Sequence, residues 1–85
     1  MKMEYVVYIL RSKRTGRYYC GQTSRLYERF LEHNRGETRS LRRGIPWELI
    51  WWEYHESRSS AMRRERYIKS RGIGRFLFEE GIHPG

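Results

Sequence analysis

The sequence contains only one cysteine, Cys20, and no long apolar run. A single cysteine excludes an internal disulfide framework. The three histidines, His33, His55 and His83, lie too far apart in the chain for a local metal motif, and no zinc spacing occurs. The apolar runs are far shorter than the roughly 18 residues of a transmembrane helix, and the first ten residues are unlike a signal peptide. We therefore expect a soluble, intracellular protein of the cytoplasm, with association with the nucleoid as an option.

The large apolar residues Leu, Ile, Val and Phe are scarce as well. Leu, Ile, Val and Phe make up about one fifth of the 85 residues, which is close to the level of disordered chains. The aromatic residues argue for a folded domain, because each of the 3 Trp, 7 Tyr and 3 Phe can bury about 150–250 Å². A chain of this length has room for one domain. We predict a single domain over residues 1–85, with a core over about 5–78 and a tail over 79–85.

Acidic residues are outnumbered, since 18 Lys and Arg stand against 10 Asp and Glu, for a net charge of +8. This balance favours a polyanion as partner, and nucleic acid is the commonest one. The alternative is a solvated basic surface that only keeps the protein soluble. The basic residues cluster before the third predicted strand and along the second predicted helix, and we predict nucleic-acid contacts for Arg39, Arg42, Arg43, Arg58, Arg63, Arg64, Arg66 and Lys69.

The chain begins with a predicted β-hairpin. Residues 5–10 are β-branched and aromatic, which is typical of a buried strand, and residues 17–22 form the returning strand after a polar turn. A turn centred between Lys13 and Arg14 would place Tyr8 directly opposite Tyr19. Opposed side chains share one face of the sheet, so the two phenols would lie side by side. The alternative is an aromatic pair that only stabilises the hairpin, and a one-residue bulge would break the pairing.

A first helix is predicted over residues 25–35, with Ser24 as its cap and Gly36 at its end. Arg29 and His33 are four residues apart, so they stack along one edge of the helix and can reach a shared cleft. The alternative is a solvated arginine and a partly buried histidine. The apolar stripe that packs on the sheet consists of Leu26, Tyr27, Phe30 and Leu31.

A third strand is predicted over residues 47–54, and its aromatic side chains on both faces suggest that both faces are covered. A second helix follows over residues 57–70. Glu65 lies in the middle of its apolar stripe, which consists of Ala61, Met62, Ile68 and the stem of Lys69. A buried carboxylate needs a partner, so we expect an arginine from another element or a metal ion beside Glu65. A short closing helix over residues 75–80 would cover the sheet with Phe76, Leu77 and Phe78, and residues 82–85 would be frayed.

The motifs occur in a recognisable order. The tetrapeptide VYIL comes first, its tyrosine stands eleven residues before that of YCG, and ERFLEH and AMRRERYIK follow. In this order the chain resembles the GIY-YIG nuclease domain, in particular its small standalone members, from about residue 5 to residue 78. The resemblance implies an α/β (α+β) fold with a three-stranded antiparallel sheet flanked by helices.

The resemblance also assigns residues. Tyr8 and Tyr19 match the tyrosines of the two name-giving motifs, although the first motif here is VVY and lacks the glycine. Arg29 falls on the catalytic arginine, and His33 on a polar active-site position. Glu65 falls on the glutamate that binds a single divalent metal ion. Gly21 matches the glycine of the second motif, which lets a phosphate approach the strand. An asparagine near the end of the domain has no counterpart, and Asn34 is not it.

The implied function is hydrolysis of the DNA backbone by a nuclease with one Mg²⁺ or Mn²⁺ ion, in DNA repair or recombination. Glu65 would hold the ion, Arg29 would clamp a phosphate oxygen, and Tyr8 would act as general base with Tyr19 in a positioning role. These side chains and His33 should converge on one concave surface. One rival is an inactive or weakly active nucleic-acid-binding module of the same fold. Another is a basic, RNA- or ribosome-associated protein, and a protein partner for targeting remains an option.

Overall fold

Residues 4–83 are described by the structure, which is a computed structural model. The chain forms a three-stranded antiparallel sheet in the order β2-β1-β3, so that β1 is the central strand. The strands are β1 (Tyr5–Ser12), β2 (Tyr18–Thr23) and β3 (Trp47–His55). The expected three-stranded antiparallel sheet with flanking helices is thereby confirmed.

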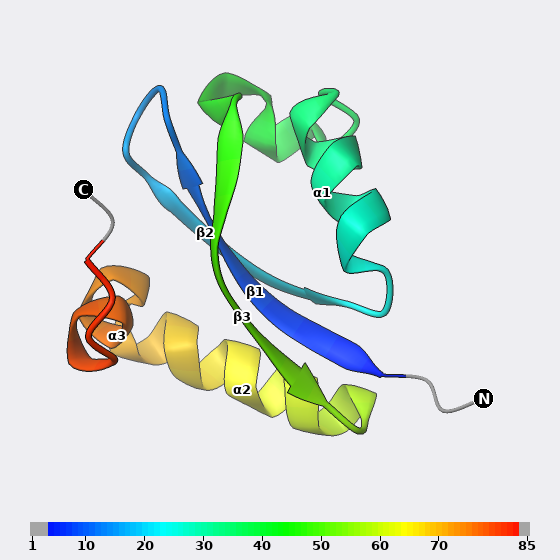
Figure 1. Ribbon diagram of the computed structural model, residues 1–85, viewed down its shortest axis with the longest axis vertical. Coiled ribbons are helices and arrows are strands. Elements are labelled where there is room, and N and C mark those ends of the chain that lie inside the picture. The colour runs from blue at the N-terminus through cyan, green and yellow to red at the C-terminus, as the bar shows by residue number, and fades with distance from the viewer. Residues whose placement is uncertain (1–3, 84–85) are drawn as a thin grey trace.

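Helices cover both faces of this sheet (Figure 1). One face carries α1 (Leu26–Asn34) and the 3-10 helix η1 (Arg39–Gly44), and the other carries α2 (Arg58–Arg71) and α3 (Ile73–Glu79). Side chains alternate along β1, so Val7 and Ile9 pack under α2 and α3 while Tyr8 and Leu10 pack under α1 and η1. The nearly continuous apolar run of β1 is explained by this burial on both sides.

The register of the hairpin differs from the prediction. Tyr8 pairs with Gly21, and Leu10 pairs with Tyr19. Ser12 moves the turn, because its hydroxyl accepts hydrogen bonds from the backbone N–H groups of Arg14 (3.1 Å) and Thr15 (2.9 Å). The predicted direct pairing of Tyr8 with Tyr19 is therefore wrong. The shift is two positions along the partner strand, which keeps every side chain on its face, so the two tyrosines are diagonal neighbours with ring centroids 6.1 Å apart.

The first helix is also placed differently. It begins at Leu26 with Arg25 as N-cap and no side-chain cap, so the predicted cap at Ser24 is wrong. Tyr27 is 74% exposed, because it lies about 100° round the helix from Leu26 and points away from the sheet. The face that packs on the sheet instead contains Leu26, Phe30 and the fully buried His33.

The expectation that both faces of β3 are covered is wrong for two of its aromatic side chains. Trp52 pairs with Tyr8 and Tyr54 with Val6, so both lie on the face of α1, yet both are exposed. The nine residues of α1 do not extend over this end of the sheet. The other face is covered there, since Trp51 packs against the ring of Phe76 with centroids 5.1 Å apart.

The C-terminal elements pack mainly through Ala61, Ile68, Phe76 and Leu77, all of which are buried. Two members of the predicted apolar surfaces are exposed instead, namely Met62 on α2 and Phe78, which is 71% exposed, on α3. Ile82 packs against the core, and its N–H donates to the carbonyl of Leu77 at 2.8 Å, so the prediction of a frayed tail is wrong at this position. Residues 84 and 85 of the predicted tail lie outside the described residues. None of the helices within residues 4–83 has the length and apolar character needed to cross a membrane.

Candidate active site

Tyr8 is the centre of a polar cluster beneath α1. Its side chain is buried, and its hydroxyl oxygen lies 2.9 Å from Nε2 of His33. Gly21 on the neighbouring strand makes room for it, because a Cβ there would lie 2.8 Å from the Tyr8 hydroxyl and 3.0 Å from the Tyr19 ring. Gly21 is therefore required by the packing of both tyrosines. Its predicted role in the approach of a phosphate stays a prediction.

His33 is buried completely, and both of its ring nitrogens have partners. Nε2 faces Tyr8, and Nδ1 lies 2.7 Å from the hydroxyl of Thr38. Burial, together with the positive charge of Arg29, lowers the pKa of His33, which favours the neutral imidazole. When Nδ1–H donates to Thr38, Nε2 is free to accept the phenolic hydrogen of Tyr8. Thr38 was missed by the sequence analysis, because it lies in a segment whose visible pattern is its arginines.

Tyr19 and Arg29 complete the cluster. The Tyr19 ring meets His33 edge-on, with centroids 5.5 Å apart. Burial raises the pKa of Tyr8 far above its ordinary value, the nearby Tyr19 adds to this rise, and the charge of Arg29 opposes it. Arg29 itself is half exposed and pairs with Glu32 at 3.2 Å on the same helix. The structure therefore brings together four of the five predicted residues, with one cation beside a phenol and a neutral imidazole.

Glu65 comes from the opposite side of the sheet, on α2 (Figure 1). Its side chain is 23% exposed, and its carboxylate accepts a hydrogen bond of 2.7 Å from Nζ of Lys69, one turn further along the helix. The expected arginine partner from another element is thus replaced by a lysine of the same helix. Burial of the Cys20 thiol on the edge strand β2, with a smaller contribution from the charge of Glu65, raises the pKa of this thiol to about 12. The hydrogen bond to Glu65 raises the pKa of Lys69, and Tyr19 adds a smaller contribution. The convergence of Glu65 with the other four residues stays a prediction.

At the edge of the sheet formed by β2, the carboxylate of Glu65 is available to a divalent ion. Within residues 4–83 no group of three or more His, Cys, Asp and Glu side chains is arranged to hold a metal ion. The Glu65 oxygens are hard donors on a partly exposed side chain, and Lys69, which binds them, is half exposed. This donor set fits an ion such as Mg²⁺, which keeps several of its water ligands, and it does not fit a site built from protein ligands alone.

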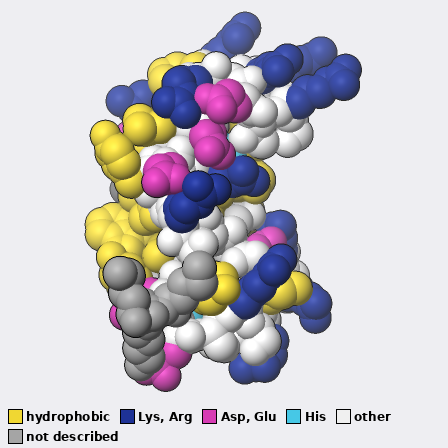
Figure 2. Space-filling view, turned by 90° about the vertical axis from the view of Figure 1, so that its right-hand side faces the viewer, with side chains coloured by type: hydrophobic (Ala, Val, Ile, Leu, Met, Phe, Trp, Pro, Cys, Tyr) yellow, Lys and Arg dark blue, Asp and Glu magenta, His cyan; other side chains and the backbone are white. Residues whose placement is uncertain are grey.

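The predicted nucleic-acid-binding residues fall into two groups. Arg42, Arg64 and Lys69 have protein partners: Arg42 donates to the carbonyl of Gly36, Arg64 binds the carboxylate of Glu53, and Lys69 binds Glu65. The remaining five have no ion-pair partner in the part of the chain that the structure describes; they are Arg39, Arg43, Arg58, Arg63 and Arg66. Figure 2 shows basic side chains gathered at the top of the molecule and again lower down.

The β1–β2 turn adds three cations that the sequence analysis did not include in the binding surface, namely Lys13, Arg14 and Arg17. None of them has an acidic partner among residues 4–83.

Asn34 has a structural role, because its side-chain amide donates to the carbonyl of Trp47 (3.0 Å) and accepts from the N–H of Trp47 (2.7 Å). These two bonds fix the end of α1 to the start of β3 and hold the neighbouring His33 in place.

Comparison with known proteins identifies the family of the chain. The family model described as the GIY-YIG catalytic domain matches residues 4–72. A UPF0213 protein of Natronomonas pharaonis is 39% identical over 71 residues, which cover 82% of each chain, and one of Haloquadratum walsbyi is 41% identical over 66 residues, covering 74% of each. The solution NMR structure of a UPF0213 protein of Bacillus halodurans is 33% identical, with a TM-score of 0.50, and covers 80% of this chain and 72% of that one.

Proposed function

The chain belongs to the GIY-YIG catalytic domain family, a family of nuclease-type domains, and on this premise we propose that it is an endonuclease that hydrolyses the DNA backbone with the help of one divalent metal ion. The observation that carries the proposal is the pair formed by the buried Tyr8 phenol and the neutral His33, 2.9 Å apart, with the Arg29 cation beside them. This pair provides a route for a proton away from an attacking water.

The raised pKa of Tyr8 means that the phenol is protonated near neutral pH. It can take a proton from water only if it gives its own proton away. Nε2 of His33 is placed to receive that proton, while Thr38 holds Nδ1. The water proton moves to the Tyr8 oxygen, the phenolic proton moves to His33, and the resulting hydroxide attacks phosphorus. As the new bond forms, the phosphorus–oxygen bond to the leaving group breaks with its electron pair, and the leaving oxygen takes up a proton from solvent water.

The charge of the reacting phosphate needs compensation from two sides. Arg29 can clamp a non-bridging oxygen with its planar guanidinium, after exchanging its exposed bond to Glu32 for the phosphate. Glu65 would hold Mg²⁺ or Mn²⁺ after Lys69 has turned away, and the bound ion would neutralise charge on the phosphate and the leaving oxygen. Lys69, once released, adds a further cation beside β2. Each of these exchanges takes place at an exposed ion pair, where the energetic cost is small.

The experiment is a nicking assay on duplex, branched and single-stranded DNA, with Mg²⁺, with Mn²⁺ and after chelation. We expect metal-dependent cleavage by the wild type. Tyr8→Phe should retain DNA binding and lose cleavage by about 10²–10⁴-fold, because it removes the group that passes the proton. A wild-type protein that binds all three DNAs and cuts none of them with either metal contradicts the proposal.

A non-catalytic nucleic-acid-binding module is the second candidate. The observation that favours it is the set of cations without acidic partners on η1, on α2 and in the β1–β2 turn, which suit phosphate contacts whether or not a bond is cut. Binding without cleavage in the same assay would support it. Equal binding of RNA and DNA would extend it to an RNA-associated protein.

A further inference from the structure

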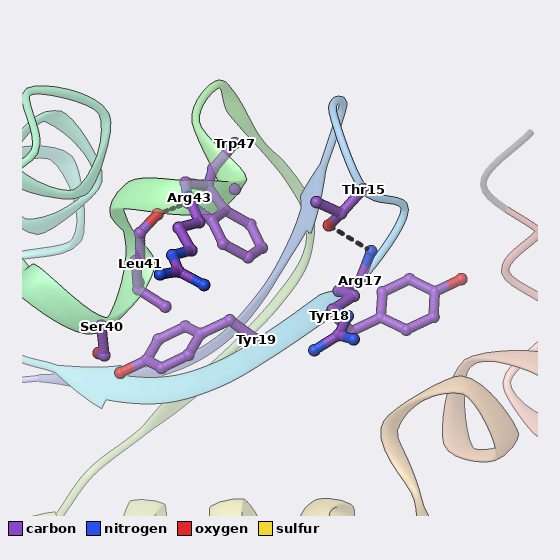
Figure 3. Close-up of a pocket in the computed structure, with 9 residues that line it drawn as sticks. Thr15, Arg17, Tyr18, Tyr19, Ser40, Leu41, Arg43 and Trp47 are labelled. Atoms are coloured by element: carbon purple, nitrogen blue, oxygen red, sulfur yellow. Dashed lines mark hydrogen bonds between the residues drawn. The ribbon is translucent and has the colours of Figure 1, made fainter.

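A pocket of about 640 Å³ opens beside the Tyr8–His33 cluster, between the β1–β2 turn, η1 and the first residue of β3 (Figure 3). Its volume falls within the roughly 300–1,000 Å³ of small-molecule sites. The mechanism above uses one residue of its lining, Tyr19. The principal lining side chains are Arg17, Tyr18, Tyr19, Leu41, Arg43 and Trp47.

The charged side chains that line the pocket are all positive. Arg17 comes from the β1–β2 turn and Arg43 from η1, and Figure 3 draws them on two sides of the opening. Both side chains are exposed, and neither has an acidic partner among residues 4–83. No carboxylate lines the pocket. Two guanidinium groups from separate elements, with no carboxylate in the lining, suit the binding of an anion such as a phosphate.

The wall of the pocket is aromatic and preformed. Trp47 is nearly buried, and its indole N–H donates to the carbonyl of Leu41 at 2.8 Å. Gly44 lets the indole ring lie against the backbone of η1, since a Cβ there would approach the ring to 2.3 Å. The ring of Tyr19 is half buried, which leaves part of it available for stacking. An aromatic wall beside paired cations suits a phosphate that carries a base.

Tyr19 joins this pocket to the candidate active site. Its ring lines the pocket and also lies 5.5 Å from the ring of His33 and 6.1 Å from that of Tyr8. We propose that the pocket binds one nucleotide of the substrate strand next to the bond that is cleaved, with its phosphate between Arg17 and Arg43 and its base against the aromatic wall. This inference rests on the proposed function for the identity of the strand. The base must leave its stack to enter, which costs least for an unpaired nucleotide.

A binding experiment tests the pocket without any cleavage. The wild-type protein is titrated with a deoxynucleoside 5′-monophosphate, and the indole N–H of Trp47 is followed by NMR. Separate titrations use inorganic phosphate and the deoxynucleoside. We expect the nucleotide to shift this signal and to bind at least several-fold more tightly than either part. Equal binding of phosphate and nucleotide would overturn the proposal, because the aromatic wall would then contribute nothing.

Two double variants distinguish binding in the pocket from attraction by the overall positive charge of the protein. The double variant Arg17→Ala with Arg43→Ala should weaken nucleotide binding roughly tenfold or more. The matched control, Arg35→Ala with Arg75→Ala, removes the same charge without touching the pocket lining, and should change nucleotide binding less than twofold. All four side chains are exposed, so both variants should fold. An equal loss in the two variants would overturn the proposal.

Cleavage kinetics separate this inference from the proposed function. On a substrate with an unpaired nucleotide beside the cut, the pocket variant should raise KM about tenfold and leave kcat within about threefold. If the wild type cuts this substrate and the variant has an unchanged KM, the pocket proposal is wrong while the nuclease proposal stands. If the wild type cuts nothing, the nuclease proposal fails, and the titrations still decide whether the pocket binds a nucleotide.

Discussion

The two faces of the sheet are built from different chemistry. Beneath α2 and α3 the buried residues are apolar, with Val7, Ile9, Ile68 and Leu77 as examples. Beneath α1 and η1 the core contains polar groups, since Ser12 and His33, the buried polar residues within 4–83, belong to this face. Every buried side-chain nitrogen and oxygen among residues 4–83 has a hydrogen-bond partner. One face therefore has an apolar buried core, with the part-buried ion pairs of Glu53 with His55 and Arg64 beside it, while the other encloses a buried network of polar groups that can do chemistry.

Glu65 does not fit this division, because it comes from the apolar side and reaches the edge of β2. Substitution of Glu65 therefore gives the strictest test of this difference between the two faces of the sheet. A structural ion pair at this exposed position contributes little to stability, whereas a metal ligand is indispensable for cleavage. We therefore expect a substitution of Glu65 to reduce cleavage without lowering stability, whereas substitutions in the polar cluster beneath α1 should reduce both.

The largest expected effect is that of Glu65→Gln. It keeps the size of the side chain and removes the charge that a divalent ion needs, so cleavage should fall by roughly 10³-fold or more. DNA binding and the melting temperature should change little. Glu79→Gln, which breaks another exposed ion pair on the same side of the sheet, serves as the control and should cut normally. Cleavage by Glu65→Gln within tenfold of the wild type would show that Glu65 is not the ligand.

Gly21→Ala should come next, because the added Cβ collides with the hydroxyl of Tyr8 and the ring of Tyr19. Overpacking of this kind costs about 1–3 kcal/mol, which lowers the melting temperature of a small domain by at least about 4–8 °C. Displacement of the tyrosines should reduce cleavage about 10²-fold. Gly74→Ala is the matched control, since its Cβ would meet Tyr18 at an ordinary 3.5 Å. Thermal melts and cleavage rates of the two variants should therefore diverge, and equal behaviour would refute this role of Gly21.

Thr38→Val should have a smaller effect. It removes the hydroxyl that holds Nδ1 of His33 and keeps the shape of the side chain. We expect a roughly tenfold lower kcat with an altered pH profile, because the imidazole is no longer fixed with Nε2 ready to accept. Thr38→Ser retains the hydroxyl and should restore both. If Thr38→Ser does not restore kcat and the pH profile, the effect of Thr38→Val comes from altered packing and not from the lost hydroxyl.

The smallest effect is the pH dependence of stability. The pKa of His33 is lowered in the folded protein by burial and by the charge of Arg29, so the unfolded chain binds this proton more readily. Stability should therefore fall as the pH drops through about 6.5, the usual histidine value, and the loss should end below the lowered pKa. Cleavage should fall in the same direction, because a protonated His33 cannot accept from Tyr8. Melting temperatures between pH 5 and 8 measure this, and His33→Gln should remove that part of the slope.

The sequence by itself determined the order of the elements, the antiparallel sheet and the faces of its side chains. These features depend on local periodicity, which a slip of two positions in the hairpin does not alter, so Tyr8 and Tyr19 share a face although their predicted pairing was wrong. For the same reason, the spacing of Arg29 and His33 predicted that both lie along one edge of the first helix, and the structure has both of them beside Tyr8.

Only the tertiary structure decided which groups meet across the sheet and between loops. Thr38 reaches His33 because η1 begins there, and no periodic pattern marks that contact. The pocket of Arg17 and Arg43 joins a turn and a 3-10 helix that are more than twenty residues apart. Such contacts depend on how loops pack, and loop packing follows from the folded core and not from local propensity.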